Sequence, residues 1–274
     1  MIEAIADQRD DQEVGIRVYG RPYVPAFING IGPFWLLFDT GCIGCRITPQ
    51  VAQKLDLEVG EDEVTCLRTF NIGSTRWNDV KFGVSDESSV VDLIGREIDG
   101  FLGNGFIYYV RTQFYVAVNY PRRTIAFRKT SGGSKPSFHA GKSHPARGSL
   151  VPVKLENYYP IVPVHIDGEG SYRFLLDTGA SRCIVSPEVA QSLRLSKGEA
   201  CKARGAIDVI DAYRSSVSRL SVGSARCEDL QVSVMDCSHV GSYVHDRVDG
   251  YIGTNFLEHF VMTLNYRDQT LTLQ

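Results

Sequence analysis

The sequence predicts an all-β protein that contains two related domains. Short runs rich in Val, Ile, Phe and Tyr alternate with Gly, Asn and Pro, a pattern typical of short strands separated by turns. The second observation is an internal repeat, because FWLLFDTG at residues 34–41 reappears as YRFLLDTG at residues 172–179, an offset of 138. This offset is far too long for the unit of a solenoid, so it indicates a duplicated domain.

The repeat continues along both copies and defines the domain limits. Residues 49–55 match residues 187–193 at the same offset, and IDGFLG at 98–103 matches VDGYIG at 248–253 at an offset of 150. The second copy therefore carries 12 extra residues between these motifs. A stretch rich in Gly, Ser, Pro and Lys lies between the copies and has the composition of a linker. We predict a polar N-terminal segment at 1–14, a first domain at 15–128, a linker at 129–149 and a second domain at 150–274.

Local patterns predict the individual elements. The expected strands of the first copy are 23–29, 34–38, 80–84 and 114–118, and those of the second copy include 230–234 and 260–264. Pro49 to Leu55 and Pro187 to Leu193 are each predicted to form a short helix, because Pro stands in the first turn after a capping Thr48 or Ser186. Each copy is thus expected to be a small β domain with one short helix.

Composition excludes several classes of protein. The net charge of −3 argues against a dedicated nucleic-acid-binding protein, which would usually be strongly basic. No stretch of 18 apolar residues is present, so no membrane segment is expected. The polar, acidic start does not resemble a signal peptide, and seven cysteines, an odd number, do not suggest a disulfide framework. These observations predict a cytoplasmic protein.

The two Asp-Thr-Gly sequences are the strongest functional signal. One such sequence would usually be a strand that ends in a turn. Here Asp39 and Asp177 each follow an apolar strand at the same place in a duplicated domain. A carboxylate at the end of an apolar strand is poorly solvated, and placing it there twice indicates that the protein uses the pair.

With both DTG sequences and the later FLG at 101–103 and YIG at 251–253, the chain resembles the retropepsin-like aspartic proteases over both copies. The resemblance implies a closed β-barrel for each copy and a pseudo-twofold axis between them, as in bilobal pepsin-like enzymes. It also implies that Asp39 and Asp177 are catalytic, share one proton and activate a water for hydrolysis of a peptide bond. The implied protein is an endopeptidase and a monomer with an intramolecular pseudo-dimer. It takes a polypeptide substrate and needs no metal or organic cofactor.

The residues that flank the two aspartates have implied roles as well. Thr40 and Thr178 are expected to fix the pair through hydroxyl hydrogen bonds, and Gly41 and Gly179 to let the backbone approach the carboxylates. The residues that follow are Cys42 and Ala180, where pepsin-like enzymes usually have Ser or Thr. Neither replaces the hydroxyl well, so we expect a less acidic optimum than pepsin's, at about pH 4.5 to 6.

The difference in length between the copies predicts a single flap. Residues 201–220 of the second copy have room for a β-hairpin over the substrate, with Gly205, Ala206 and Ile207 near its tip as substrate-binding residues. The corresponding segment of the first copy, residues 58–70, is short and acidic. The alternative is that 201–220 is only a longer surface loop.

Other candidate sites are weaker. Cys42 and Cys45 form a CxxC pair, which is compatible with redox control or half a zinc site, but no second CxxC or His cluster completes a metal site. Two small buried thiols are the favoured interpretation, since Cys183 occupies the position equivalent to Cys45. An Asp-Gly turn accounts for Asp99 and Asp249.

Two alternatives to an intramolecular protease site stay open at this point. The first is a non-catalytic peptide-binding or scaffolding protein with the same fold, since a fold does not fix a function. The intact DTG in both copies favours the enzyme. The second is that sites form between two chains, each of which would contribute one aspartate.

Overall fold

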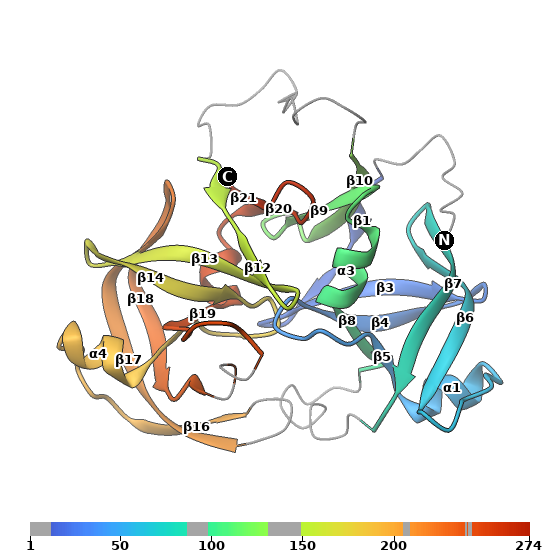
Figure 1. Cartoon of the computed structure of the whole chain (residues 1–274), viewed down its shortest axis with the longest axis horizontal. Helices are drawn as coiled ribbons and strands as arrows, with labels where there is room; N and C mark the ends of the chain where they lie inside the picture. Colours follow the sequence, from blue (N-terminus) through green and yellow to red (C-terminus); the bar gives the residue numbers. More distant parts are fainter. Residues whose placement is uncertain (1–11, 87–97, 131–148, 205–208, 239, 241–242) are drawn as a thin grey trace.

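The computed structural model describes residues 12–86, 98–130, 149–204, 209–238, 240 and 243–274. Its strands form three sheets, and two of them build separate lobes that lie side by side (Figure 1). The predicted flap tip at 205–207, residues 131–148 of the predicted linker and the first 11 residues lie outside the described part of the chain. The domain limits proposed from the sequence therefore stay a prediction.

The first lobe is a seven-stranded sheet with the order β2-β3-β4-β8-β5-β7-β6. Its strands are β2 (Arg17–Val18), β3 (Pro22–Ile28), β4 (Ile31–Asp39), β5 (Arg46–Ile47), β6 (Val64–Ile72), β7 (Thr75–Val84) and β8 (Gly100–Gly103). Strand β3 also pairs with β6, so the sheet closes on itself as the resemblance implied. Strand β4 runs parallel to β8, which brings the first DTG beside the later FLG.

The second lobe repeats this plan with eight strands in the order β12-β13-β14-β19-β15-β18-β17-β16. Its strands are β12 (Lys154–Glu156), β13 (Tyr159–Ile166), β14 (Glu169–Leu176), β15 (Ile184–Val185), β16 (Ala200–Arg204), β17 (Val209–Val222), β18 (Ala225–Met235) and β19 (Gly250–Ile252). Pairing of β13 with β17 closes this sheet, and β14 runs parallel to β19. The two closed β-barrels confirm the predicted fold class.

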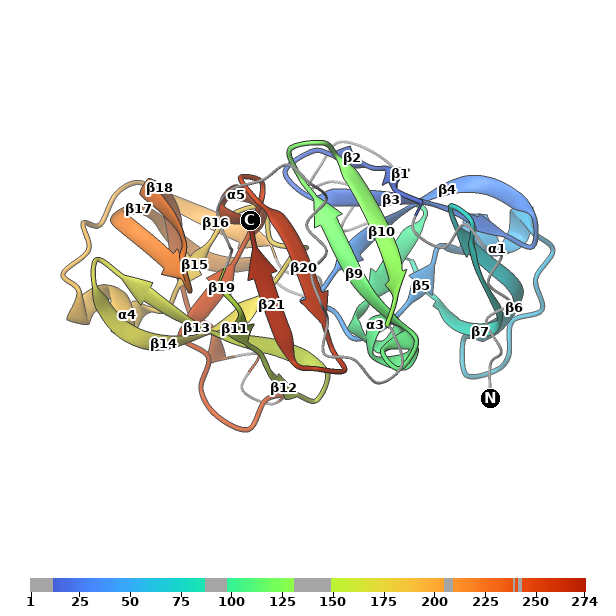
Figure 2. The same cartoon turned by 90° about the horizontal axis from the view of Figure 1, so that it is seen from above.

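A third sheet joins the two lobes and was not predicted. Its order is β1-β10-β9-β20-β21-β11, so each half of the chain contributes three strands (Figure 2). These strands are β1 (Val14–Gly15), β9 (Phe114–Asn119), β10 (Thr124–Lys129), β11 (Val151–Pro152), β20 (Val261–Asn265) and β21 (Thr270–Leu273). The central pair is antiparallel, with Val118 opposite Met262. Hydrogen bonds between β9 and β20 therefore hold the halves in one register.

The helices agree with the prediction in part. Helices α1 (Pro49–Lys54) and α4 (Pro187–Ser192) form where expected, and the hydroxyls of Thr48 and Ser186 cap them. The expectation of one helix in each copy was wrong, because α3 (Asn104–Val110) and α5 (Thr254–Leu257) add a second one. Both begin directly after the late glycine motif. Their apolar and aromatic residues resemble a strand locally, but they turn inward and pack on the core.

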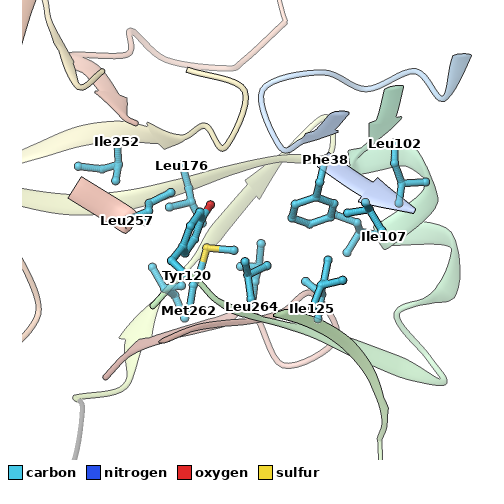
Figure 3. Close-up of a cluster of buried hydrophobic side chains, with 14 of the residues drawn as sticks. Phe38, Leu102, Ile107, Tyr120, Ile125, Leu176, Ile252, Leu257, Met262 and Leu264 are labelled. Atoms are coloured by element: carbon cyan, nitrogen blue, oxygen red, sulfur yellow. The ribbon is translucent and has the colours of Figure 1, made fainter. Parts of the chain in front are cut away.

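The core continues from the lobes into the space beneath the DTG loops (Figure 3). Phe38 and Leu176, which immediately precede the two aspartates, are fully buried there. Successive side chains of a strand point to opposite faces, so Asp39 and Asp177 are directed away from this core. None of the helices in the described ranges is long and apolar enough to cross a membrane.

Candidate active site

The two DTG loops of one chain meet at the boundary between the lobes. Asp39 ends β4, and Asp177 follows β14 directly. A Cβ atom added to Gly41 would overlap the carboxyl group of Asp177, and one added to Gly179 would overlap that of Asp39. Each carboxyl group thus lies against the backbone of the opposite loop, and only glycine leaves room for this approach.

Thr40 and Thr178 link the two loops through reciprocal hydrogen bonds. The backbone N–H of each threonine donates to the hydroxyl of the other at 3.0 Å. The Thr40 hydroxyl donates to the carbonyl of Leu176, and the Thr178 hydroxyl donates to that of Phe38, both at 2.6 Å. Both threonines are fully buried, so these bonds are shielded from water. These four hydrogen bonds are nearly twofold symmetric.

The residues that directly follow the late glycine motifs donate hydrogen bonds to the carbonyls of the two threonines. The Asn104 side chain donates to the carbonyl of Thr40, and the hydroxyl of Thr254, at the equivalent position, donates to the carbonyl of Thr178 at 3.2 Å. Tyr266 of the second half reaches across and donates to the Asn104 side chain. The position of the first DTG loop therefore depends on a residue from the other half of the chain.

The carboxyl groups themselves interact closely. The Gly41 N–H donates to Asp39 Oδ1 at 2.8 Å, and the N–H groups of Gly179 and Ala180 donate to Asp177 Oδ1 at 2.9 and 3.0 Å. Burial raises the pKa of Asp39 above its usual value, and a hydrogen bond from Asp177 opposes that rise. Burial and then the negative charge of Asp39 raise the pKa of Asp177. The pair therefore retains a shared proton to a higher pH than a solvated carboxyl group would.

One cation acts on both carboxyl groups. The charge of Arg21, which directly precedes β3, lowers the pKa of Asp39 and of Asp177 and so partly offsets their burial. The turn that contains Gly20 lies against the second DTG loop, because a Cβ on Gly20 would be 3.5 Å from the Cβ of Ser181. Arg21 is not among the site residues predicted from the sequence.

The cysteines near the site are thiols. Cys42 Sγ lies 3.6 Å from the carbonyl of Gly44, and burial followed by the charge of Asp39 raises the pKa of its thiol to about 12. Cys45 lies beside Gly103, and Cys183 accepts from the N–H of Gly253 at 3.3 Å. Cys45 and Cys183 thus occupy matching places beside the late glycines. All seven cysteines are unpaired in the structure.

The remaining candidates lie elsewhere. The carboxylates of Asp99 and Asp249 accept from the backbone N–H groups of Trp35 and Arg173 at 2.6 and 2.9 Å, so they hold the strands that lead to DTG. Within the described ranges, no group of three His, Cys, Asp or Glu side chains is arranged to hold a metal ion.

The segment predicted as a flap forms a hairpin in its described parts. Strands β16 and β17 are antiparallel, with Arg204 opposite Val209, and the side chains of Cys201, Ala203 and Ile210 pack against an apolar cluster of the second lobe. The predicted tip residues Gly205, Ala206 and Ile207 lie outside the described residues. In the first lobe, residues 58–63 contribute no comparable pair of strands.

Three residues of the site, Asn104, Tyr266 and Arg21, were not predicted from the sequence. The repeat offered a signal for the first two, because Asn119-Tyr120 matches Asn265-Tyr266 and Asn104 matches Thr254. For Arg21 the repeat offered only a difference between the copies, since the equivalent residue in the second copy is Tyr159.

Comparisons with known proteins agree with this geometry. Residues 162–256 match the aspartyl protease family model, and this range includes the second DTG. Among solved structures, the aspartic proteinase from Irpex lacteus has a similar fold, with a TM-score of 0.55 and 12% sequence identity over 96% of each chain. No curated protein sequence matched significantly. Residues 162–256 therefore resemble the aspartyl proteases in sequence, and the chain as a whole has an aspartic-protease-like, two-lobed fold.

Proposed function

We propose that this protein is an aspartic endopeptidase whose catalytic pair is Asp39 and Asp177. The observation that carries the proposal is the contact between the two carboxyl groups, each held against the glycine of the opposite DTG loop. Their raised pKa values favour a state in which one proton is shared, which is the state that this chemistry needs.

The proposed reaction uses the pair as one acid–base unit. The ionised carboxylate takes a proton from a water held between the two groups, and the resulting hydroxide attacks the carbonyl carbon of the peptide. The protonated carboxyl donates its proton to the carbonyl oxygen, which gives a neutral gem-diol. When the C–N bond breaks, the leaving nitrogen receives a proton from the pair and one diol hydroxyl returns a proton to it. The products are a carboxylic acid and an amine.

The substrate in this proposal is an extended peptide that lies across the dyad. The hairpin of β16 and β17 supports assigning the flap to the second lobe, where backbone groups would pair with the substrate as an added strand. We include Gly205, Ala206 and Ile207 as the flap residues that contact the peptide.

A single chain supplies both aspartates, so we propose that the active unit is a monomer that acts as an intramolecular pseudo-dimer. Residues 15–128 and 150–274 are its two domains. We also propose a cytoplasmic location, because seven free thiols suit a reducing compartment.

The experiment that tests the proposal is cleavage of a mixed peptide library between pH 3 and pH 7.5. Wild type and the Asp177→Asn variant are compared, with circular dichroism to establish that both are folded. Cleavage that the variant loses supports the proposal and also gives the specificity. Folded wild type that binds peptides but cleaves none at any pH would contradict the proposal and favour a peptide-binding protein.

A further inference from the structure

The two lobes are not equivalent beside the dyad. In the second lobe, Tyr159 is only 8% exposed and belongs to an apolar cluster that includes Leu175, Met235 and Tyr251. Ile43 from the loop that follows the first DTG packs against the same cluster. The region near the dyad that Tyr159 lines is therefore apolar.

The corresponding region of the first lobe contains a cation. Residue 21 is equivalent to residue 159 at the offset of 138, and both precede a proline. Among the described residues, the matching apolar cluster contains Tyr23, Leu37, Ile98 and Phe101, with Trp35 packed against it. The twofold relation thus places an arginine at one position beside the dyad and a tyrosine at the other.

Arg21 is half-buried, and within the described ranges its charge acts on the two dyad carboxyl groups but forms no salt bridge. Its Nε atom is buried and makes no hydrogen bond. Beyond Asp177 itself, the second DTG loop offers no carboxylate to Arg21, since residues 178–183 have the sequence TGASRC. By contrast, the half-buried Arg173 donates to both carboxylate oxygens of Glu156 at 3.1 Å. A guanidinium with an unsatisfied donor favours a planar anion that can accept two hydrogen bonds.

We propose that Arg21 is a specificity-determining residue that binds the carboxylate of an Asp or Glu side chain in the substrate. This inference rests on the proposed function, since it assumes that a peptide lies across the dyad. Because an arginine and a tyrosine occupy the two equivalent positions, the proposal requires that the substrate bind in one chain direction only. The acidic side chain lies on the side of Arg21, and an apolar side chain occupies the equivalent place beside Tyr159.

Binding tests this inference separately from cleavage. The Asp177→Asn protein replaces one carboxyl group with an uncharged amide, so the dyad keeps a single negative charge while its acid–base chemistry is lost. A random decapeptide library is passed over this protein, and the retained peptides are sequenced by mass spectrometry. The library is amidated at its C-termini, so that only a side chain can supply a carboxylate. One retained acidic peptide is then compared with its Glu→Gln or Asp→Asn counterpart.

The matched variants separate charge from geometry. Arg21→Gln should reduce affinity for the acidic peptide about tenfold and leave its amide counterpart unchanged. Arg21→Lys keeps the charge without the planar fork and should give an intermediate loss. Arg17→Gln is the control for net charge, because it removes one positive charge from the same lobe. The guanidinium of Arg17 lies over the ring of Trp35, 3.7 Å from its centre.

Three results would overturn the inference: no enrichment of Asp or Glu at one position, an enrichment that survives in Arg21→Gln, or no retained peptide at all. The proposed function is judged on its own by cleavage with the wild type. A wild type that cleaves without an acidic preference would therefore reject the role of Arg21 and leave the protease assignment intact.

Discussion

Thr40 and Thr178 exchange hydrogen bonds across the boundary between the two lobes, each backbone N–H donating to the other hydroxyl at 3.0 Å. The same two hydroxyls donate to the carbonyls of the opposite strands. The network therefore joins the two loops at the residues that directly follow Asp39 and Asp177.

Replacement of Thr178 by Val tests this network. The change keeps the shape of the side chain but removes the acceptor for the Thr40 N–H and the donor to the Phe38 carbonyl. We expect the free energy of unfolding to fall by roughly 2–4 kcal/mol, because two buried groups lose their partner. Urea denaturation measures this loss, and Thr178→Ser, which keeps the hydroxyl, is the control. A Val variant as stable as the Ser variant would show that the bonds do not hold the loops together.

The link from Tyr266 to Asn104 predicts an effect of one half on the other. Tyr266→Phe removes the hydroxyl that donates to Asn104, whose amide supports the Thr40 carbonyl. We expect a loss of stability of about 1–2 kcal/mol and a lower kcat with little change in KM.

The equivalent tyrosine in the other half provides the control. The hydroxyl of Tyr120 lies toward Thr254 without a hydrogen bond of ordinary geometry, and its ring lies among Leu176, Leu257 and Met262 (Figure 3). Tyr120→Phe should therefore change both stability and kcat less than Tyr266→Phe does. Equal effects of the two replacements would contradict the proposed support of Thr40.

Glu156 predicts a pH dependence of stability. It is buried, accepts from Lys154 and Arg173 and from the N–H of His245, and these partners lower its pKa to about 2 although burial alone would raise it. A carboxyl with a lowered pKa stabilises the fold above its unfolded pKa, and this contribution is lost as the pH falls from about 4.5 toward about 2.

Glu156→Gln should therefore cost about 3 kcal/mol at neutral pH, with the difference from wild type shrinking below about pH 4. The matched control is Glu228→Gln, because Glu228 pairs with Arg219 at 2.8 Å while both side chains are about half exposed. That variant should differ from wild type by less than about 1 kcal/mol. Denaturation curves at several pH values test both, and a Glu156→Gln difference that does not vary with pH would refute this role.

The charge of Arg21 predicts a shift in the pH–rate profile. It favours the ionised form of both dyad carboxyl groups, so Arg21→Gln should raise their pKa values and move the acidic limb of kcat/KM upward by about 0.5–1 pH unit. Tyr159 and Cys42 also face the pair, but the pKa of each is raised to about 12, so both stay neutral across this range.

The Arg17→Gln variant serves as the control for the pH–rate profile as well, since it removes one positive charge from the same lobe. Its acidic limb should coincide with that of wild type. If Arg21→Gln also leaves the limb in place, the charge of Arg21 does not act on the reacting form of the dyad.

Much of the fold could be predicted from the repeat, but contacts between its copies could not. The DTG loops, the capped helices and the twofold relation all follow from local patterns that occur twice. Strands β9 and β20 pair although they lie more than 140 residues apart, and the sequence of neither strand indicates its partner. Helix α3 escaped notice because its sequence, NGFIYYV, lacks a helical period and contains aromatic and β-branched residues that favour strands.

The candidate site could likewise be predicted from the sequence only in part. Asp39 and Asp177 could be predicted because an apolar strand that ends in a carboxylate is costly without a use. Arg21 could not be linked to them, since only the three-dimensional fold brings the turn before β3 against the second DTG loop.

The central claim is that Asp39 and Asp177 act as one unit, and a double-mutant cycle tests it most directly. The value of kcat/KM is measured on one cleaved peptide for wild type, Asp39→Asn, Asp177→Asn and the double variant. We predict that each single replacement lowers the rate by about a thousandfold or more. The double variant should lose no more than either single one, because residues that act together are not additive. A single variant that keeps the wild-type rate would contradict the account.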